Sequence, residues 1–181
     1  DNCGFGLIAN LQGRPSRKIV IDSIEALKSM THRGGIGSDG KTGDGCGLML
    51  NINKDFFIKA IKDEQNINLS NRFAIGQLFY FEDFQLVKSK IKKILNEEGL
   101  KLVTKRDVPI NKDILGHIAL DCIPNIYQIF IESNNNMSDE EFETALLQSR
   151  KFIEEIHLND EKLYFCSFSA KTIIYKGLML P

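Results

Sequence analysis

The chain has 181 residues, 43% of them hydrophobic, and a formal net charge of −1 at neutral pH. This length and apolar content suffice for one domain with a real core, and the near-neutral charge gives no basic footprint of the kind that binds nucleic acid. No apolar stretch approaches the roughly 20 residues that span a bilayer, and no signal-peptide pattern opens the chain. We therefore expect a cytoplasmic protein without nucleic-acid or membrane partners.

A cysteine lies close to the start of the chain, in the segment CGFGLIA at residues 3–9. Removal of Asp1 and Asn2 would leave Cys3 with a thiol and a free α-amine, whose pKa of about 8 allows it to accept the proton of its own thiol. We expect the mature chain to begin at this residue. The apolar residues 7–9 predict a buried first strand. The alternative is a terminal strand with an inert cysteine, because most free cysteines behave as small hydrophobic residues.

A helix and a long glycine-rich loop follow. Ser16 is a good N-cap for apolar residues at helical spacing, and the glycine pair at 34–35 ends the predicted helix. The loop continues to residue 47, with charges from Arg33 and Asp44, and a second buried strand is predicted after it at residues 48–52. A loop of this length inside a compact domain is usually functional. In the predicted helix that follows Ser16, the apolar residues at helical spacing are Val20, Ile24 and Leu27.

Nucleotide binding is a poor explanation of this loop. Gly35 and the segment Gly40-Lys41-Thr42 have the spacing of a phosphate-binding P-loop. A P-loop, however, runs from a strand into a helix, whereas here the predicted helix precedes the loop and the predicted strand follows it. Because the context is reversed, we do not expect a phosphate site.

The middle and the end of the chain alternate between strands and helices, which predicts an α+β fold in a single domain. One helix is capped by Asp83 and ended by Gly99, and another opens with a capping box between Ser138 and Glu141. The inward faces of these helices are formed by Phe84, Val87, Ile91 and Ile94, and by Phe142, Leu146, Ile153 and Ile156. The predicted strands are residues 73–81, 100–108 and 126–131, and two final strands within 164–177 that pair across residues 169–171.

These segments together resemble a known family. The segments CGFG at 3–6, THRGG at 31–35 and TGDGCG at 42–47 are similar to the N-terminal glutamine amidotransferase domain of the glutamate synthase large subunit. The segment at 164–177 is similar to paired strands of that domain. The resemblance extends from residue 3 to about residue 180. Its most specific part is the His-Arg-Gly and Thr-Gly-Asp-Gly pair at this spacing.

The resemblance implies a four-layer αββα sandwich of the N-terminal-nucleophile hydrolases, with residues 1–181 forming the N-terminal part of a class II glutamine amidotransferase domain. It implies that Cys3 attacks the side-chain amide of L-glutamine and that the ammonia released is used to make glutamate from 2-oxoglutarate. Arg33 is the expected substrate-binding residue, since its guanidinium can recognise a carboxylate. Neither His32 nor His117 is needed as a base if the α-amine of Cys3 takes the proton.

The resemblance also implies parts that lie elsewhere. FMN and an iron–sulfur cluster belong to the full-length enzyme and have no site in this chain, and the partners are the remainder of the polypeptide and a small reductase subunit. In the family an Asn-Gly pair supplies oxyanion donors, but no Asn-Gly dipeptide occurs in the 181 residues. We therefore expect a fragment truncated at its C-terminus that is inactive in isolation, because losing a single oxyanion donor commonly slows catalysis by roughly 100-fold to 1,000-fold.

Two alternatives stay open at this point. The chain could be the glutaminase domain of another amidotransferase, such as the phosphoribosyl-pyrophosphate or glucosamine-phosphate type, although the Thr-Gly-Asp-Gly loop argues against both. It could also be a non-catalytic interaction domain that keeps the fold. Besides Cys3, the chain has Cys46, Cys122 and Cys166, which are too scattered for a zinc site. Cys122 and Cys166 have apolar neighbours, which predicts inert core positions.

Overall fold

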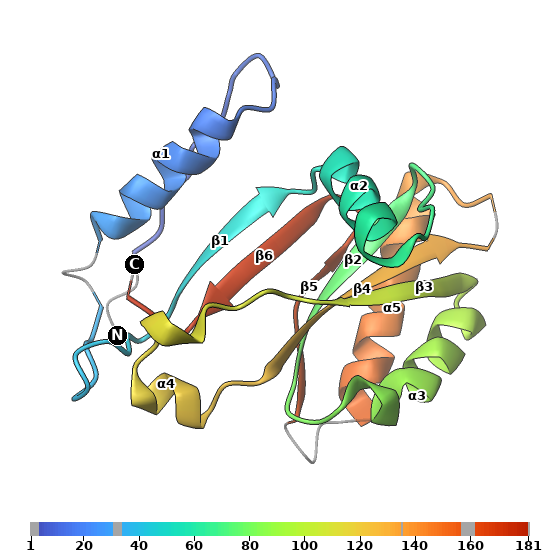
Figure 1. Ribbon diagram of the computed structural model, residues 1–181. Coiled ribbons are helices and arrows are strands. Elements are labelled where there is room, and N and C mark those ends of the chain that lie inside the picture. Colours follow the sequence, from blue (N-terminus) through green and yellow to red (C-terminus); the bar gives the residue numbers. More distant parts are fainter. Residues whose placement is uncertain (1–3, 31–33, 135, 157–161, 181) are drawn as a thin grey trace. The chain divides into compact units, whose positions relative to one another are not determined.

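The computed structural model describes residues 4–30, 34–134, 136–156 and 162–180 (Figure 1). Helices and strands alternate along most of the chain, as the sequence predicts. In chain order the elements are α1 (Arg17–Lys28), β1 (Cys46–Asn51), α2 (Lys54–Gln65), β2 (Phe73–Tyr80), α3 (Phe84–Glu97), β3 (Leu100–Asp107), a 3₁₀ turn (Lys112–Ile114), α4 (His117–Asp121), β4 (Asn125–Ser133), α5 (Asp139–Ile156), β5 (Leu163–Ser169) and β6 (Thr172–Gly177).

The elements fall into two compact units. The first draws on Asp1–Leu50, Ile110–Ile123 and Tyr175–Pro181, and the second on Asn51–Pro109 and Pro124–Ile174. The second unit contains a four-stranded sheet in the order β3-β4-β2-β5, in which neighbouring strands are antiparallel. Strands β1 and β6 pair with each other in a separate two-stranded sheet. Helices combined with these sheets confirm the predicted α+β class.

The core of the second unit lies between the four-stranded sheet and the helices α3 and α5. Apolar side chains repeat at helical spacing on both helices, and they meet side chains that alternate along β2 and β4 and further side chains from β5. The opposite face of the sheet carries α2, whose Phe57 ring lies 5.8 Å from that of Phe130. The centre of the cluster beneath α3 and α5 is completely buried and includes Leu78, Ile91, Leu95, Leu100, Ile129, Ile131, Leu146 and Phe165.

A second contact between α2 and the sheet is polar. The guanidinium of Arg106 on β3 donates to both carboxylate oxygens of Glu64 on α2, at 2.7 to 3.0 Å, and to Gln128 on β4 at 3.2 Å. The hydrogen bond from Arg106 lowers the pKa of Glu64 below its ordinary value. The bidentate pair therefore fixes the C-terminal end of α2 on the edge of the sheet.

The predicted capping box of α5 is confirmed. The Glu141 amide donates to the Ser138 hydroxyl at 3.2 Å, and the Ser138 amide donates to the Glu141 carboxylate at 2.6 Å. We expect Ser138→Ala to lower the free energy of unfolding by about 1 kcal/mol, because it leaves an amide of the first turn without its acceptor. Chemical denaturation measures this loss. Thr144→Ala, which removes an exposed hydroxyl in the middle of the same helix, should change stability by less than about 0.5 kcal/mol, and equal losses would contradict the capping role.

The prediction that the last two strands pair with each other is wrong. Strand β5 pairs with β2 and strand β6 pairs with β1, so the chain changes sheets at the connection between them. Side-chain oxygens replace a hairpin ladder there: Ser169 Oγ accepts from the amides of Lys171 and Thr172, and Ser167 Oγ accepts from the amide of Ile174. Serine hydroxyls compete locally with ladder bonds, which lets the backbone turn away from the sheet.

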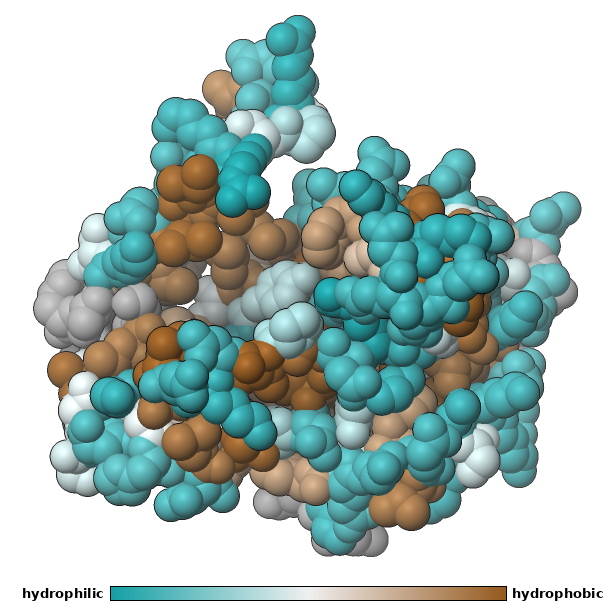
Figure 2. Space-filling view, in the orientation of Figure 1, coloured by the Kyte–Doolittle hydropathy of each residue, from teal (hydrophilic) through white to brown (hydrophobic). Residues whose placement is uncertain are grey.

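The start of the chain also differs from the prediction. Residues 4–10 form no strand, and Phe5 and Leu7 are 96% and 90% exposed. An apolar run becomes a strand only where another strand pairs with it, and no described strand pairs with this segment. Helix α1 forms as expected, but it ends at Lys28, before the glycine pair, and buries no residue. Ile21 and Ile24 on this helix are exposed, and Figure 2 shows apolar surface on the helix.

Two further differences concern helices. Helix α2, which the sequence pattern does not predict, lies between Asn53 and Asn66, and the Asn53 side chain caps it by accepting from the Phe56 amide. Ile156, predicted to face inward on α5, is 52% exposed because it belongs to the last turn, beyond the edge of the core.

Candidate functional site

The glycine-rich loop forms a compact hairpin in the first unit. Ile36 and Gly43 pair in an isolated antiparallel bridge, and the Gly37 amide donates to the Thr42 carbonyl at 2.7 Å. The tip is a turn in which the Gly40 amide donates to the Gly37 carbonyl at 2.9 Å. Strand β1 begins directly after the hairpin, so the order of elements is the reverse of a P-loop, as predicted.

Asp39 is the structural centre of this hairpin. Its Oδ1 accepts from the amides of Lys41 and Thr42 at 3.0 and 2.8 Å, and its Oδ2 accepts from the Thr42 hydroxyl at 2.6 Å. The same Oδ2 accepts from the Ile118 amide at 3.2 Å, although Ile118 lies 79 positions along the chain. The Asp39 side chain is only 4% exposed. One carboxylate therefore joins the loop to the start of α4.

Thr42 reinforces this connection. Its hydroxyl donates to Asp39 and accepts from the amide of Ala119 at 3.2 Å, so it is satisfied in both directions. Thr42 and Ala119 are themselves buried. The loop and α4 are thus held by two neighbouring hydrogen bonds whose acceptors belong to the loop and whose donors are backbone amides of the helix.

The charge of Asp39 is stabilised by its surroundings. The hydroxyl and amide of Thr42, then the amides of Lys41 and Ile118, hold the pKa of the Asp39 carboxyl far below its ordinary value, although burial opposes them. His117 lies nearby, with Nδ1 at 3.7 Å from Asp39 Oδ2, and is largely exposed. Asp39 is therefore a fixed anion, suited to holding backbone in place and unsuited to proton transfer near neutral pH.

At two positions in this packing there is no room for a side chain, so glycine is required. A Cβ on Gly116 would lie 2.1 Å from Asp39 Oδ2 and 2.6 Å from the Thr42 hydroxyl. A Cβ on Gly43 would lie 2.7 Å from the carbonyl oxygen of Met179. Real side chains do not approach this closely, so any other residue at either position would displace the loop.

The base of the loop is tied together by Asp44 and leads into β1. The Gly35 amide donates to Asp44 Oδ2 at 2.7 Å, and the Asp44 amide donates to the Gly35 carbonyl at 3.3 Å. Cys46, the first residue of β1, is half-buried, and burial raises the pKa of its thiol. This cysteine is therefore a poor candidate for a reactive thiolate.

The two residues predicted to carry the chemistry, Cys3 and Arg33, lie outside the described residues, as does His32. The structure does describe the segments that adjoin them, from Gly4 onward and from Gly34 onward. Cys166 is buried as expected, but the prediction that Cys122 is a core residue is wrong. Cys122 is exposed because it follows the last turn of the short helix α4, where its thiol donates to the carbonyl of Ile118 at 3.4 Å.

Asp39, Thr42 and Gly116 were not assigned any role from the sequence. An Asp followed three positions later by Thr is typical of a loop whose side chain binds its own backbone, and this spacing was available as a signal. The long-range bond to Ile118 had no such signal. No group of three or more His, Cys, Asp or Glu that could hold a metal ion occurs in the part of the chain that the structure describes, and none of its helices is long and apolar enough to cross a membrane.

Comparison with known proteins decides the family. Residues 3–181 match the family described as glutamine amidotransferases class-II. The chain belongs to this family. The match begins at Cys3 and includes the whole hairpin around Asp39, so the resemblance seen in the sequence is confirmed.

Relatives of this class-II amidotransferase are glutamate synthases. The chain is 40% identical over 185 residues to ferredoxin-dependent glutamate synthase 1 of Arabidopsis thaliana, and the match covers 98% of the chain and 11% of the relative. It is 39% and 36% identical over 188 residues to the NADPH glutamate synthase large chains of Azospirillum brasilense and Bacillus subtilis, covering 99% and 100% of the chain and 12% of each relative. The chain thus spans about a tenth of the length of these relatives.

Proposed function

We propose that this chain is the N-terminal part of the amidotransferase domain of a glutamate synthase, and that within that polypeptide it supplies the nucleophile for hydrolysis of the side-chain amide of L-glutamine. The observation that carries this proposal is the family match over residues 3–181, which begins at the cysteine, combined with relatives named as glutamate synthases. These names also argue against the phosphoribosyl-pyrophosphate and glucosamine-phosphate types of amidotransferase.

The chemistry follows from the two functional groups of an N-terminal cysteine. The α-amine of Cys3 accepts the thiol proton, and the thiolate attacks the amide carbon to give a tetrahedral intermediate. That intermediate collapses as ammonia leaves with the proton held by the amine, and water then hydrolyses the thioester to release glutamate. Asp1 and Asn2 must be absent from the active form, because an acylated amine cannot act as the base.

Arg33 has the proposed role of binding the α-carboxylate of glutamine. It directly precedes Gly34 and Gly35, and the Gly35 amide is held by Asp44. The hairpin that follows is fixed by Asp39 and Thr42. These contacts hold the backbone that follows Arg33, and a guanidinium is the side-chain group best suited to binding a carboxylate, which supports the proposed role.

The ammonia would be consumed outside this chain. We infer that the remainder of the polypeptide uses it to convert 2-oxoglutarate to glutamate with FMN and an iron–sulfur cluster, that a small reductase subunit is a candidate partner, and that the enzyme is cytoplasmic. The described residues do not fit an iron–sulfur cluster, because Cys46, Cys122 and Cys166 are dispersed and no metal-holding group is found among them. An iron–sulfur cluster would therefore be bound by other segments.

Glutamine labelled with ¹⁵N in its amide tests the function in the polypeptide that carries this chain. We expect labelled ammonia, unlabelled glutamate from the hydrolysed glutamine, and labelled glutamate when 2-oxoglutarate and reductant are added. Asparagine, which is shorter by one methylene, is the matched control and should release far less label. A polypeptide that binds glutamine without releasing labelled ammonia would contradict the proposal and would favour a non-catalytic domain.

A further inference from the structure

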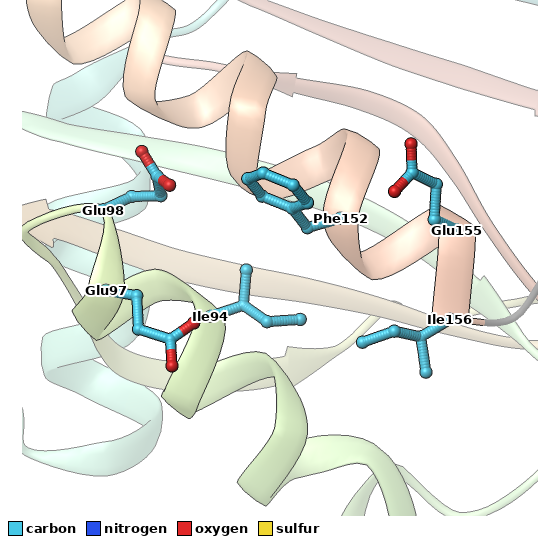
Figure 3. Close-up of a pocket in the computed structure, with 6 residues that line it drawn as sticks. All are labelled: Ile94, Glu97, Glu98, Phe152, Glu155 and Ile156. Atoms are coloured by element: carbon cyan, nitrogen blue, oxygen red, sulfur yellow. The ribbon is translucent and has the colours of Figure 1, made fainter.

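The second unit has an open cavity of about 450 Å³ between the C-terminal turns of α3 and α5. Figure 3 shows the apolar side chains between the two helices and the carboxylates around them. Both helices belong to the same unit and pack against each other through the core of the sheet. The lining residues are Ile94, Glu97 and Glu98 from α3, and Phe152, Glu155 and Ile156 from α5.

The floor of this cavity is apolar and accessible. Ile94 is 7% exposed, whereas Phe152 and Ile156 are 48% and 52% exposed. One turn earlier on α5, Ile153 is buried against the sheet. The exposed ring and the exposed isoleucine therefore extend the apolar face of the helix beyond what its own core requires, and covering them would be favourable.

The charges around the cavity oppose the electrostatics of the helices. The C-terminal end of a helix carries partial negative charge and favours basic side chains, yet neither α3 nor α5 has a basic residue in its last turn. The cavity has three glutamates there instead. Glu97 has only a distant ion pair, with Lys93 at 3.9 Å, and no ion pair with Glu98 or Glu155 is found among the described residues.

We propose that this groove binds a basic amphipathic segment of a partner protein. An apolar side chain of the segment would enter the cavity beside Phe152, and lysine or arginine side chains would pair with Glu98 and Glu155. Such a segment satisfies both anomalies at once, because it covers exposed apolar surface and supplies the positive charge that the described last turns of α3 and α5 lack. Binding at this surface is independent of glutamine hydrolysis.

The probe is a synthetic helical peptide with leucines at positions i, i+3 and i+7 and flanking arginines, labelled for fluorescence anisotropy with the full chain. We expect binding that weakens as salt is added. The double variant Glu98→Gln/Glu155→Gln and the single variant Phe152→Ala should each reduce affinity by about tenfold. The same peptide with glutamates in place of the arginines should not bind.

A matched control separates the groove from general attraction to negative charge. Asp63 on α2 and Glu140 at the start of α5 are exposed carboxylates away from the cavity, so Asp63→Asn/Glu140→Gln removes the same charge. Affinity should stay within about twofold of the unaltered chain. Equal losses in both double variants, equal binding of the acidic peptide, or no binding of the basic peptide would overturn the proposal.

Stability provides an independent readout. If Glu98 and Glu155 are retained for a partner, their neutralisation should remove an unfavourable interaction with the helix ends and raise the melting temperature by roughly 1 to 5 °C. The same variant would then be more stable and bind the basic peptide less tightly. A lower melting temperature would show that these carboxylates stabilise the fold itself, and the proposal would be wrong.

Discussion

Replacing Cys3 with alanine is expected to reduce glutamine-dependent activity by about 10⁴-fold or more in the polypeptide that carries this chain, because the covalent route through a thioester is lost. Synthesis from added ammonia should continue, since it does not need the amide to be hydrolysed. Steady-state assays with glutamine and with ammonium salts measure the two activities side by side. A variant that lost both activities equally would contradict a role restricted to amide hydrolysis.

Selective alkylation gives a second measurement of the same prediction. A glutamine analogue with an electrophilic side chain should modify Cys3 and spare the other cysteines, as read by peptide mass spectrometry. The structure supplies the reasons: burial raises the pKa of the Cys46 thiol, and Cys166 is buried. Cys122 is exposed and is therefore the control for non-selective labelling. Modification of Cys122 at the rate of Cys3 would count against an activated nucleophile.

The parts of the fold that could be predicted from the sequence are those where local signals agree with one another. Helix α3 has a capping Asp83, apolar residues at helical spacing and a terminating Gly99, and helix α5 has its capping box. Each of these signals concerns residues that are neighbours in the chain. They were enough to place both helices, because the capping signals mark where each helix begins or ends and the apolar spacing marks its buried face.

The errors with the largest effect on the fold concern pairing between distant segments. Strands β5 and β6 are adjacent in the sequence and separated by a short polar connection, which is typical of a hairpin, yet they belong to different sheets. Which sheet each strand joins depends on the serine hydroxyls that accept hydrogen bonds from backbone amides of the connection. It also depends on the partner strands β2 and β1, which lie far away in the chain. Residues 4–10 illustrate the same limit, since an apolar run alone does not supply a partner strand.

The candidate site, like the fold, could be predicted only in part. Family motifs pointed to Cys3 and Arg33, and the density of glycines pointed to the loop. The residue that organises the loop, Asp39, was overlooked because its importance depends on Ile118 and Gly116, which are distant in sequence. A carboxylate with four donors from two segments can be recognised only when the segments are seen together.

Asp39→Asn is expected to disorder the glycine-rich loop even though the side chain keeps its size. All four groups that contact the carboxylate are donors: the amides of Lys41, Thr42 and Ile118, and the Thr42 hydroxyl. Asparagine offers one acceptor oxygen, and its amide nitrogen would face donors wherever it is placed. We expect amide hydrogen exchange at Thr42 and Ile118 to become faster by about tenfold or more, and glutamine-dependent kcat/KM to fall.

Variants of Thr42 and Gly116 test whether the loop is held by hydrogen bonds to Asp39 or by the shape of the side chains around it. Thr42→Ser keeps the hydroxyl and should preserve exchange rates and activity, whereas Thr42→Val keeps the shape and should reproduce the defect. Gly116→Ala should destabilise the unit by about 1 to 3 kcal/mol, since its methyl group would overlap the Asp39 carboxylate. Slow exchange and unchanged kinetics in Asp39→Asn would show that the loop is held by other contacts.

Lowering the pH should not reproduce the effect of Asp39→Asn on the loop. The hydrogen bonds from Thr42 place the pKa of Asp39 far below its ordinary value of 3.8, so the ionised carboxylate persists when most aspartates are protonated. A group with a lowered pKa contributes stability above its unfolded pKa and loses that contribution only as the pH falls through the folded pKa. Exchange at Thr42 should therefore stay slow in the unaltered chain at about pH 3, once corrected for the intrinsic rate, while Asp39→Asn exchanges quickly at every pH.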